Sequence, residues 1–396
     1  MKISEDRNIT FIPYDIIANI LRRLPVKSLI QFQCVSKDWE NLIKSPSFIR
    51  DCLYHTGRPT PLLLLSQLGL TPRYCFQLLD PQSKQVLEIQ NPPLIDSCSD
   101  LKIVGSCNGL VCLQVFHEDY GLYLPCSSND SGTSPPYLLL WNPATRQFRK
   151  VPRTIEDFNV RHRLGFGFNP IDNDYKIVKL SSQFAVNPVE VYSLNSGSWE
   201  EVEFENLEGT IRISSWTNAV NGVVYWLGGK QRRSDDCDYS LVVSIDLTNQ
   251  VCTSIPLPDL GSKKSRRLKL ILYENKLAVL AITKSSLIHL WVMEEDTCAS
   301  RGRWIWTKRY TCSLWSTRLS PFELNAATIW KSKIVSRPIR IFGDADETKR
   351  FCLIDLTTNE FKEFVIKCRR CNVLDINNYV ESHVSVANIN HKELQI

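Results

Sequence analysis

The chain has 396 residues, of which 43% are apolar, 22% charged and 10% aromatic. This composition is typical of a globular protein and excludes disorder over most of the length. The length exceeds one usual compact core, so it predicts two domains or one large repeat architecture. The net charge of +5 is modest and spread along the chain, so it gives no electrostatic case for nucleic-acid binding.

No segment indicates secretion, membrane insertion or metal binding. The N-terminal MKISEDRN lacks an apolar core behind its charges, and the longest apolar run, 61–70, is far shorter than a membrane span. The 14 cysteines mostly stand singly in apolar runs, where thiols act as small core residues. The CRRC at 368–371 has no second pair at zinc-site spacing. We therefore expect a cytoplasmic protein, with the nucleus as the open alternative, and no metal or cofactor.

Residues 12–48 show the spacing of three short helices. The first carries one apolar stripe, made of Ile16, Ile17, Ile20, Leu21 and Leu24. Pro25 ends this helix and opens a second, 26–34, because proline lacks the N–H that a helix interior needs. Ser36 is suited to cap a third helix, which ends before Pro46.

A cluster of this size cannot bury all its apolar surface by itself. From the residues alone, two explanations stay open. The stripe packs against the remainder of the chain, or it faces another protein.

The segment of residues 10–50 resembles an F-box. It contains IPYDIIANILRRLPVKSLIQFQCVSKDWENLIKSPSFI, which follows the family pattern from a Leu-Pro start through LP-V and C-V-S-K-x-W to a closing P-x-F. Ile12 stands where the family has leucine, and the residues after Phe48 depart from the plant form. The resemblance implies docking on the Skp-type adaptor of a cullin–RING ubiquitin ligase.

Carried over position by position, the resemblance implies which side chains form the adaptor-binding surface or its immediate support. They are Pro13, Ile16, Ile17, Ile20, Leu21, Leu24, Pro25, Val26, Leu29, Val35 and Trp39. Aliphatic and aromatic anchors of this kind carry most interface energy. The resemblance therefore favours a partner protein as the cover for the stripe.

Beyond about residue 60 the pattern changes to short β runs separated by turn residues. An apolar strand, a polar turn and a second strand recur at spacings of roughly 50–60 residues. Two further strands precede most copies, which predicts a β-propeller of four-stranded blades, six by our count. The recurring units are 74–89, 138–152, 189–202, 241–257, 287–310 and 350–366.

The first blade offers only three strands in sequence, beginning with PLLLLS at 61–66. A fourth is available at the other end of the chain, within 373–386. Pairing the two would close the ring and remove an exposed sheet edge. We therefore predict closure by the C-terminal strand.

This region resembles the plant F-box-associated interaction domain, a kelch-like module. The signatures are CNGLVCL (107–113), LWNPATRQFRKVP (140–152), GFGFNPIDNDYKIVKL (165–180), NGVVYWLGG (221–229) and NYVESHVSV (378–386). Only Gly228-Gly229 matches the paired glycines of true kelch repeats, so the region is a divergent relative. The predicted organisation is a tail (1–8), an F-box domain (9–52), a linker (53–60), a propeller (61–387) and a tail (388–396).

Propeller geometry places the connections on two opposite faces. Turns between third and fourth strands are mostly tight. The long connections, such as 114–137 and 230–240, fall almost entirely on the opposite face, which carries the loops between second and third strands. Long loops on a rigid scaffold tend to carry recognition, so we predict target binding opposite the F-box. The candidate target-binding residues are His117, Tyr120, Tyr123, Arg161, His162, Arg232, Arg233 and Asp235. The alternative is that each is an ordinary solvated loop residue.

No catalytic constellation is visible. The six histidines are scattered, and no nucleophile elbow, phosphate loop or dinucleotide fingerprint occurs. We therefore predict a non-catalytic substrate-recognition subunit of a Skp–cullin–F-box ligase, which brings an unknown protein target to ubiquitination and proteasomal degradation. Its partners would be the adaptor and, through it, cullin and RING subunits, without nucleic acid or membrane. The open alternatives are a non-degradative F-box scaffold, a pollen S-locus determinant that binds secreted ribonucleases, and a propeller enzyme or glycan-binding module.

Overall fold

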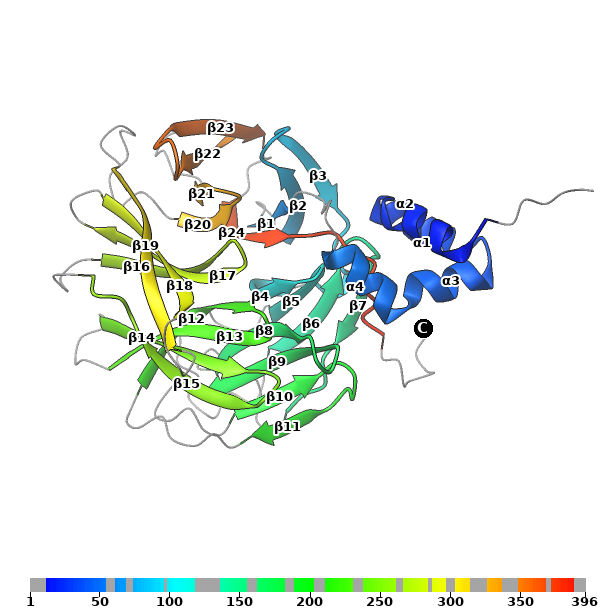
Figure 1. Ribbon diagram of the computed structural model, residues 1–396, viewed down its shortest axis with the longest axis horizontal. Coiled ribbons are helices and arrows are strands. Elements are labelled where there is room, and N and C mark those ends of the chain that lie inside the picture. Colours follow the sequence, from blue (N-terminus) through cyan, green and yellow to red (C-terminus); the bar gives the residue numbers. More distant parts are fainter. Residues whose placement is uncertain are drawn as a thin grey trace, which may run out of the picture.

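The computed structural model describes fifteen segments of the chain. They are residues 12–54, 61–68, 74–95, 98–117, 136–154, 162–181, 189–202, 211–230, 238–260, 266–283, 287–296, 303–313, 326–336, 348–367 and 372–387. A small helical domain lies at one side of a ring of β-sheets (Figure 1). Within these segments, no helix is both long and apolar enough to cross a membrane.

The described part of the helical domain contains four helices, so the expectation of three was wrong. They are α1 (Tyr14–Arg22), α2 (Val26–Phe32), α3 (Lys37–Lys44) and α4 (Pro46–Tyr54). Pro46 does end α3, as predicted, but it also opens α4. Proline fits the first helical turn, where its missing N–H would have no partner. The additional helix carries Phe48 into the core of the domain.

The predicted helix boundaries at Pro25 and Ser36 are confirmed. Pro25 directly precedes α2. The backbone N–H of Trp39 donates a hydrogen bond to Ser36 Oγ at 3.2 Å, which satisfies one of the unpaired donors at the start of α3. Both residues therefore act locally, as the sequence suggested.

The described strands form six four-stranded antiparallel sheets, which confirms the predicted blade count. The first blade joins β24 (Asn372–Tyr379), β1 (Leu62–Leu68), β2 (Tyr74–Asp80) and β3 (Gln85–Ile89). A short 3-10 helix (Pro93–Ile95) follows. The second contains β4 (Cys98–Cys107), β5 (Leu110–His117), β6 (Tyr137–Asn142) and β7 (Gln147–Lys150).

The remaining blades follow in chain order. The third contains β8 (His162–Asn169), β9 (Asp174–Ser181), β10 (Val189–Ser193) and β11 (Trp199–Val202). The fourth contains β12 (Ile211–Val220), β13 (Val223–Lys230), β14 (Asp238–Asp246) and β15 (Val251–Pro256). The fifth contains β16 (Arg266–Tyr273), β17 (Lys276–Thr283), β18 (Leu287–Asp296) and β19 (Arg303–Ser313). The sixth contains β20 (Ala326–Trp330), β21 (Lys333–Ser336), β22 (Thr348–Asp355) and β23 (Phe361–Lys367).

The C-terminal strand closes the ring, as predicted. β24 pairs antiparallel with β1, from Leu62 opposite Tyr379 to Leu68 opposite Asn372. The first blade therefore combines the two ends of the propeller sequence. This pairing covers the backbone edge of β1 and gives the first blade its fourth strand.

The tight turns between third and fourth strands share one local device. In the second blade, Asn142 Oδ1 accepts hydrogen bonds from the backbone N–H groups of Ala144 at 2.9 Å and Thr145 at 3.3 Å. Arg146 then takes a positive φ of 62°. Asp246 and Asp355 accept in the same way in the fourth and sixth blades. Asn and Asp favour such turns because their short side chains replace a backbone acceptor.

Neighbouring blades approach closely at the GFGF signature. A Cβ atom on Gly165 of β8 would lie 2.5 Å from Val224 Cγ1 and 2.6 Å from Trp226 Cζ2, both on β13. Only glycine therefore fits between these two blades without displacing the side chains opposite. The apolar core lies mainly between adjacent sheets in this way.

Candidate functional site: an exposed F-box stripe and the propeller channel

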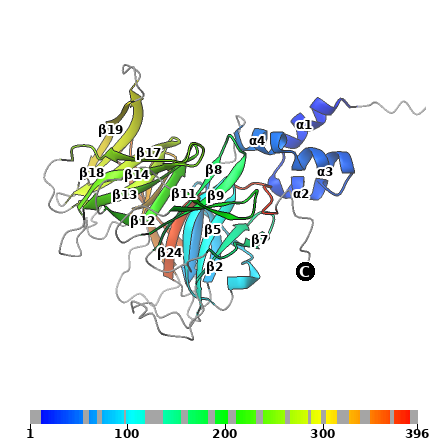
Figure 2. The ribbon, with the colours of Figure 1, turned by 90° about the horizontal axis from the view of Figure 1, so that it is seen from below.

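The outward face of α1 is aliphatic and exposed. Ile16 is 50% exposed and Ile20, one turn later, is 52% exposed. Ile12 and Tyr14, at the start of the helix, are also exposed. Figure 2 shows α1 standing away from the strands, so the described strands of the propeller do not cover this face.

The inward face of α1 builds the core of the F-box. Leu21 is 1% exposed and packs with Leu29, Ile43 and Phe48. Trp39 closes one side of this core, and its ring meets that of Phe32 edge-on at a centroid distance of 5.5 Å.

The structure sorts the predicted adaptor-binding residues by exposure. The exposed members are Pro13, Ile16, Ile20, Pro25 and Val35. The half-buried members are Ile17, Leu24, Val26 and Trp39, and the buried ones are Leu21 and Leu29. The sequence did not mark Ile12 and Tyr14 as exposed apolar residues, and Ile12 precedes α1, so helical spacing does not apply to it.

A second apolar face of the F-box packs on the propeller. Ile49 and Leu53 of α4 join a cluster that contains Phe168 of β8 and Val384. The ring of Phe48 lies 5.8 Å from that of His383. A cavity of about 120 Å³ remains in this joint, between α4, the ends of the third-blade strands and the C-terminal segment.

The C-terminal segment 380–387 is the middle layer of this joint. Ser382 Oγ donates a hydrogen bond to the carbonyl of Asn108 at 2.6 Å. Asn142 Nδ2 donates to the carbonyls of Ser382 at 3.1 Å and Val384 at 2.7 Å. Burial lowers the pKa of His383 to about 4, although a hydrogen bond with the backbone of Ile43 opposes the shift. The segment that follows the closing strand therefore also holds the F-box.

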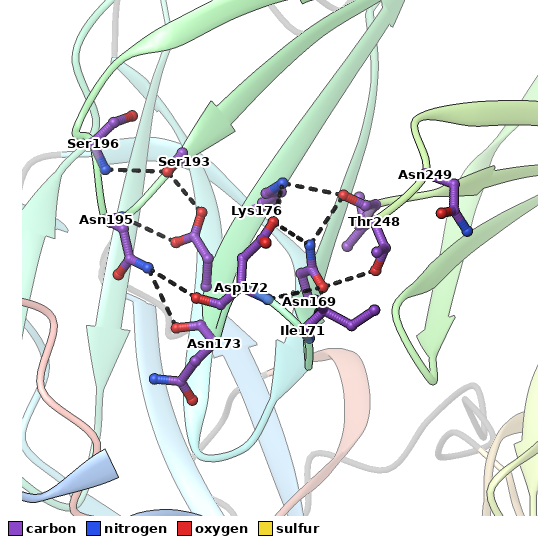
Figure 3. Close-up of polar contacts among 12 residues, drawn as sticks. Asn169, Ile171, Asp172, Asn173, Lys176, Ser193, Asn195, Ser196, Thr248 and Asn249 are labelled. Atoms are coloured by element: carbon purple, nitrogen blue, oxygen red, sulfur yellow. Dashed lines mark hydrogen bonds and ion pairs between the residues drawn. The ribbon is translucent and has the colours of Figure 1, made fainter.

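A polar corner beside the joint ties the third blade to the fourth (Figure 3). Thr248 Oγ1 donates to the buried Asn169 Oδ1 at 2.8 Å. Lys176 Nζ donates to the carbonyl of Leu247 at 3.1 Å and to Asp172 Oδ2 at 3.3 Å. These residues belong to the NPIDNDYK signature and to the tight turn of the next blade. Their role in the structure is to fix neighbouring blades relative to each other.

Most of the predicted target-facing loop residues lie outside the described residues. These are Tyr120, Tyr123, Arg161, Arg232, Arg233 and Asp235. His117 is the last residue of β5 and pairs with Cys98 in the sheet. His162 begins β8 and is only 8% exposed. The expectation that His162 lies exposed in a connection was wrong, because its strand begins two residues earlier than the glycine-rich pattern suggested.

A narrow cavity of about 90 Å³ lies in the centre of the ring. Its lining comes from the innermost strand of every blade, namely β4, β8, β12, β16, β20 and β24. Trp216, Lys269 and Asp375 are among its side chains. No spacing along the chain marks these residues, since their shared position depends on the closed ring. In the described ranges, no group of three His, Cys, Asp or Glu side chains is placed to hold a metal ion.

Family models match both parts of the chain. A model described as "F-box domain" matches residues 9–51, and one described as "F-box associated beta propeller domain" matches residues 66–390. The chain is a plant F-box protein with an F-box-associated β-propeller. The closed six-bladed ring and the exposed α1 face are thus features of a member of this family.

Curated relatives of this F-box protein come from Arabidopsis thaliana. F-box protein At1g71320 is 24% identical over 336 residues, which cover 77% of this chain and 83% of the relative. F-box protein At2g21930 is 27% identical over 323 residues, which cover 76% of this chain and 74% of the relative. F-box protein At5g52610 is 28% identical over 309 residues, which cover 74% of this chain and 76% of the relative. Among solved structures, the β-propeller domain of Cps50 (Swd1) from Myceliophthora thermophila aligns with a TM-score of 0.40 and 8% identity, over 77% of this chain and 83% of that one.

Proposed function

We propose that this F-box protein is the substrate-recognition subunit of a Skp–cullin–F-box ubiquitin ligase. The exposed aliphatic face of α1 carries this proposal. Ile16 and Ile20 are half exposed, although the same domain buries Leu21 and Ile43 almost completely. An apolar cluster of this kind on the surface marks an interaction site. An F-box implies a Skp-type adaptor as the partner.

The propeller would supply the target-binding end of the complex. The α4 joint fixes the F-box to the ring through Ile49, Leu53 and Val384, so a target bound to the propeller would stay near the ligase machinery. Holding two reactants together in this way raises their effective concentration and lowers the entropic part of the barrier. The receptor itself would catalyse no step.

The test is affinity capture of the full chain under block of the proteasome or of cullin neddylation. We expect the adaptor, cullin and RING subunits to co-purify, together with a protein that accumulates only under the block. Absence of the adaptor and cullin from the captured material would refute the proposal. An adaptor-containing complex whose bound protein ignores the block would support the non-degradative scaffold instead.

The self-incompatibility role is a special case of the same proposal. Capture of a secreted ribonuclease as the accumulating protein would support it, and capture of other proteins would exclude it for the conditions used. A lysine-ubiquitin remnant on the captured target, measured by mass spectrometry, distinguishes a degradation substrate from a passively bound protein.

A further inference from the structure

A cavity lies where the F-box meets the propeller. It has a volume of about 120 Å³ and is bounded by α4, the third blade and the C-terminal segment. An apolar cavity of about 150 Å³ accommodates a benzene-sized molecule and stays dry when it is empty. The joint therefore has room for a small molecule of about one ring, but not for a peptide of several residues.

The walls of this cavity are apolar and come from three parts of the chain. Ile49 and Leu53 lie four residues apart in α4 and therefore on one face of the helix. The third blade contributes Phe168 and Tyr175, whose ring centroids lie 4.8 Å apart. The C-terminal segment contributes the buried Val384. A ligand between these walls would contact the F-box and the propeller at once.

The rim of the cavity carries cations and no carboxylate. Arg50 of α4 and Lys44 of α3 line it, whereas none of its described lining residues is an Asp or Glu. Lys44 Nζ already forms an ion pair with Glu40 at 2.7 Å. The exposed Arg50 side chain has no ion pair or hydrogen bond with the described residues. Arg50 is therefore the cation that an anionic ligand could engage.

Two neutral side chains can add hydrogen-bond donors at the rim. Asn173 lies in the turn after β8, and Figure 3 shows its side-chain amide directed away from the bonded polar corner. The Ser385 hydroxyl oxygen accepts a hydrogen bond from the N–H of Ala387 at 3.1 Å, so its own hydrogen stays available to a ligand. Guanidinium, amide and hydroxyl donors together suit a carboxylate, which only accepts hydrogen bonds.

We propose that the joint binds a small apolar carboxylate of about one ring. Its apolar part would lie between α4 and the third blade, and its carboxylate would accept hydrogen bonds from Arg50, Asn173 and Ser385. Because the ligand would contact both domains, its binding would stabilise their placement relative to each other. A cationic ligand would meet Arg50 without a carboxylate on the cavity wall to offset the repulsion. The inference goes beyond the proposed function, since it concerns the joint and requires neither the adaptor nor a target.

The experiment titrates the full chain with three probes of similar size and different charge. These are phenylacetate, the neutral phenylacetamide and the cationic 2-phenylethylamine, and calorimetry or ligand-observed NMR measures their affinities. Phenylacetate should bind saturably with a Kd of about 1 mM or lower, as expected for a ligand of this size. It should bind roughly 3-fold more tightly than the other two probes, because a charge pair at an exposed rim contributes modestly.

Three variants locate the bound probe. Ile49→Phe places a ring in the cavity and should abolish binding of all three probes. Arg50→Gln should lower the affinity for phenylacetate to that for phenylacetamide, with the affinity for the amide unchanged. Arg23→Gln is the matched control, because Arg23 is an exposed arginine of the F-box that does not line the cavity. Should Ile49→Phe melt at a lower temperature than the wild type, Ala387→Trp at the exposed rim should block the cavity instead.

Absence of saturable binding by every probe would overturn the inference, as would binding that persists in both Ile49→Phe and Ala387→Trp. Equal affinities for the three probes would refute the assignment of a carboxylate. Equal losses in Arg50→Gln and Arg23→Gln would indicate general charge attraction and refute it as well. Capture of the adaptor and cullin is measured on separate samples, so neither experiment decides the other.

Discussion

The F-box has two apolar faces that differ in what covers them. On α4, Ile49 and Leu53 pack against the propeller and its C-terminal segment. On α1, Ile16 and Ile20 stay about half exposed, although both faces consist of similar aliphatic residues. Burial of apolar surface is equally favourable at both; among the residues that the structure describes, the propeller and the C-terminal segment cover the α4 face and leave the α1 face about half exposed. The first face is therefore a joint within the protein, and the second is the surface that the proposed adaptor would cover.

The largest effect should come from charging the interface. We expect Ile16→Asp/Ile20→Asp to weaken adaptor binding at least about 100-fold, because buried interface anchors each contribute about 2 kcal/mol or more. Surface substitutions usually change the unfolding free energy by no more than about 0.5 kcal/mol, so the fold should persist. Calorimetric titration with the adaptor measures the affinity. The exposed Asn41→Asp on α3 is the control, and an equal loss there would contradict the assignment.

A neighbouring residue on the same helix should behave in the opposite way. Leu21→Ala removes a side chain that is 1% exposed, and such core truncations lower the unfolding free energy by about 2–5 kcal/mol. Ile20→Ala, one position earlier, should change it by less than about 0.5 kcal/mol. Urea denaturation of the two variants compares them directly. Similar losses of stability would show that α1 has no distinct exposed face.

The joint should weaken in acid because of His383. Its folded-state pKa of about 4 lies below the ordinary value of 6.5, so the folded protein binds fewer protons than the unfolded chain. Stability is therefore retained above pH 6.5 and lost as the pH falls toward 4, by up to roughly 3 kcal/mol. Thermal melts at pH 7 and pH 4.5 measure this loss. His383→Gln should flatten the dependence, and an unchanged pH profile in that variant would refute the assignment.

The smallest effect concerns the cap of α3. Ser36→Ala removes the acceptor for the N–H of Trp39, and loss of such a cap lowers the unfolding free energy by about 1 kcal/mol. Ser36→Asp retains an acceptor and should restore most of the stability. Chemical denaturation of the two variants tests the pair. A loss much larger than about 2 kcal/mol would mean that Ser36 makes a further stabilising contact.

The turn and strand patterns were predictable because their causes are local. Asn142, Asp246 and Asp355 each accept from the backbone two and three residues ahead, so the sequence already contains both partners. The helix ends at Pro25 and Ser36 were predictable for the same reason. The fourth helix was missed because Pro46 serves at once as the end of α3 and the start of α4, and local rules favour both roles.

Periodicity and motif spacing along the chain were enough to predict the two-part organisation, the six blades and the residue types of the F-box stripe. Helical and strand periodicity report directly which positions are apolar, and the C-terminal strand was the available partner for the incomplete first blade. Only the tertiary structure separated Ile20, which faces outward, from Leu21, which faces the core. It alone brought Lys102, Arg163, Trp216 and Lys269 together. Those residues come from four blades, so their proximity is set by ring closure and not by any spacing along the chain.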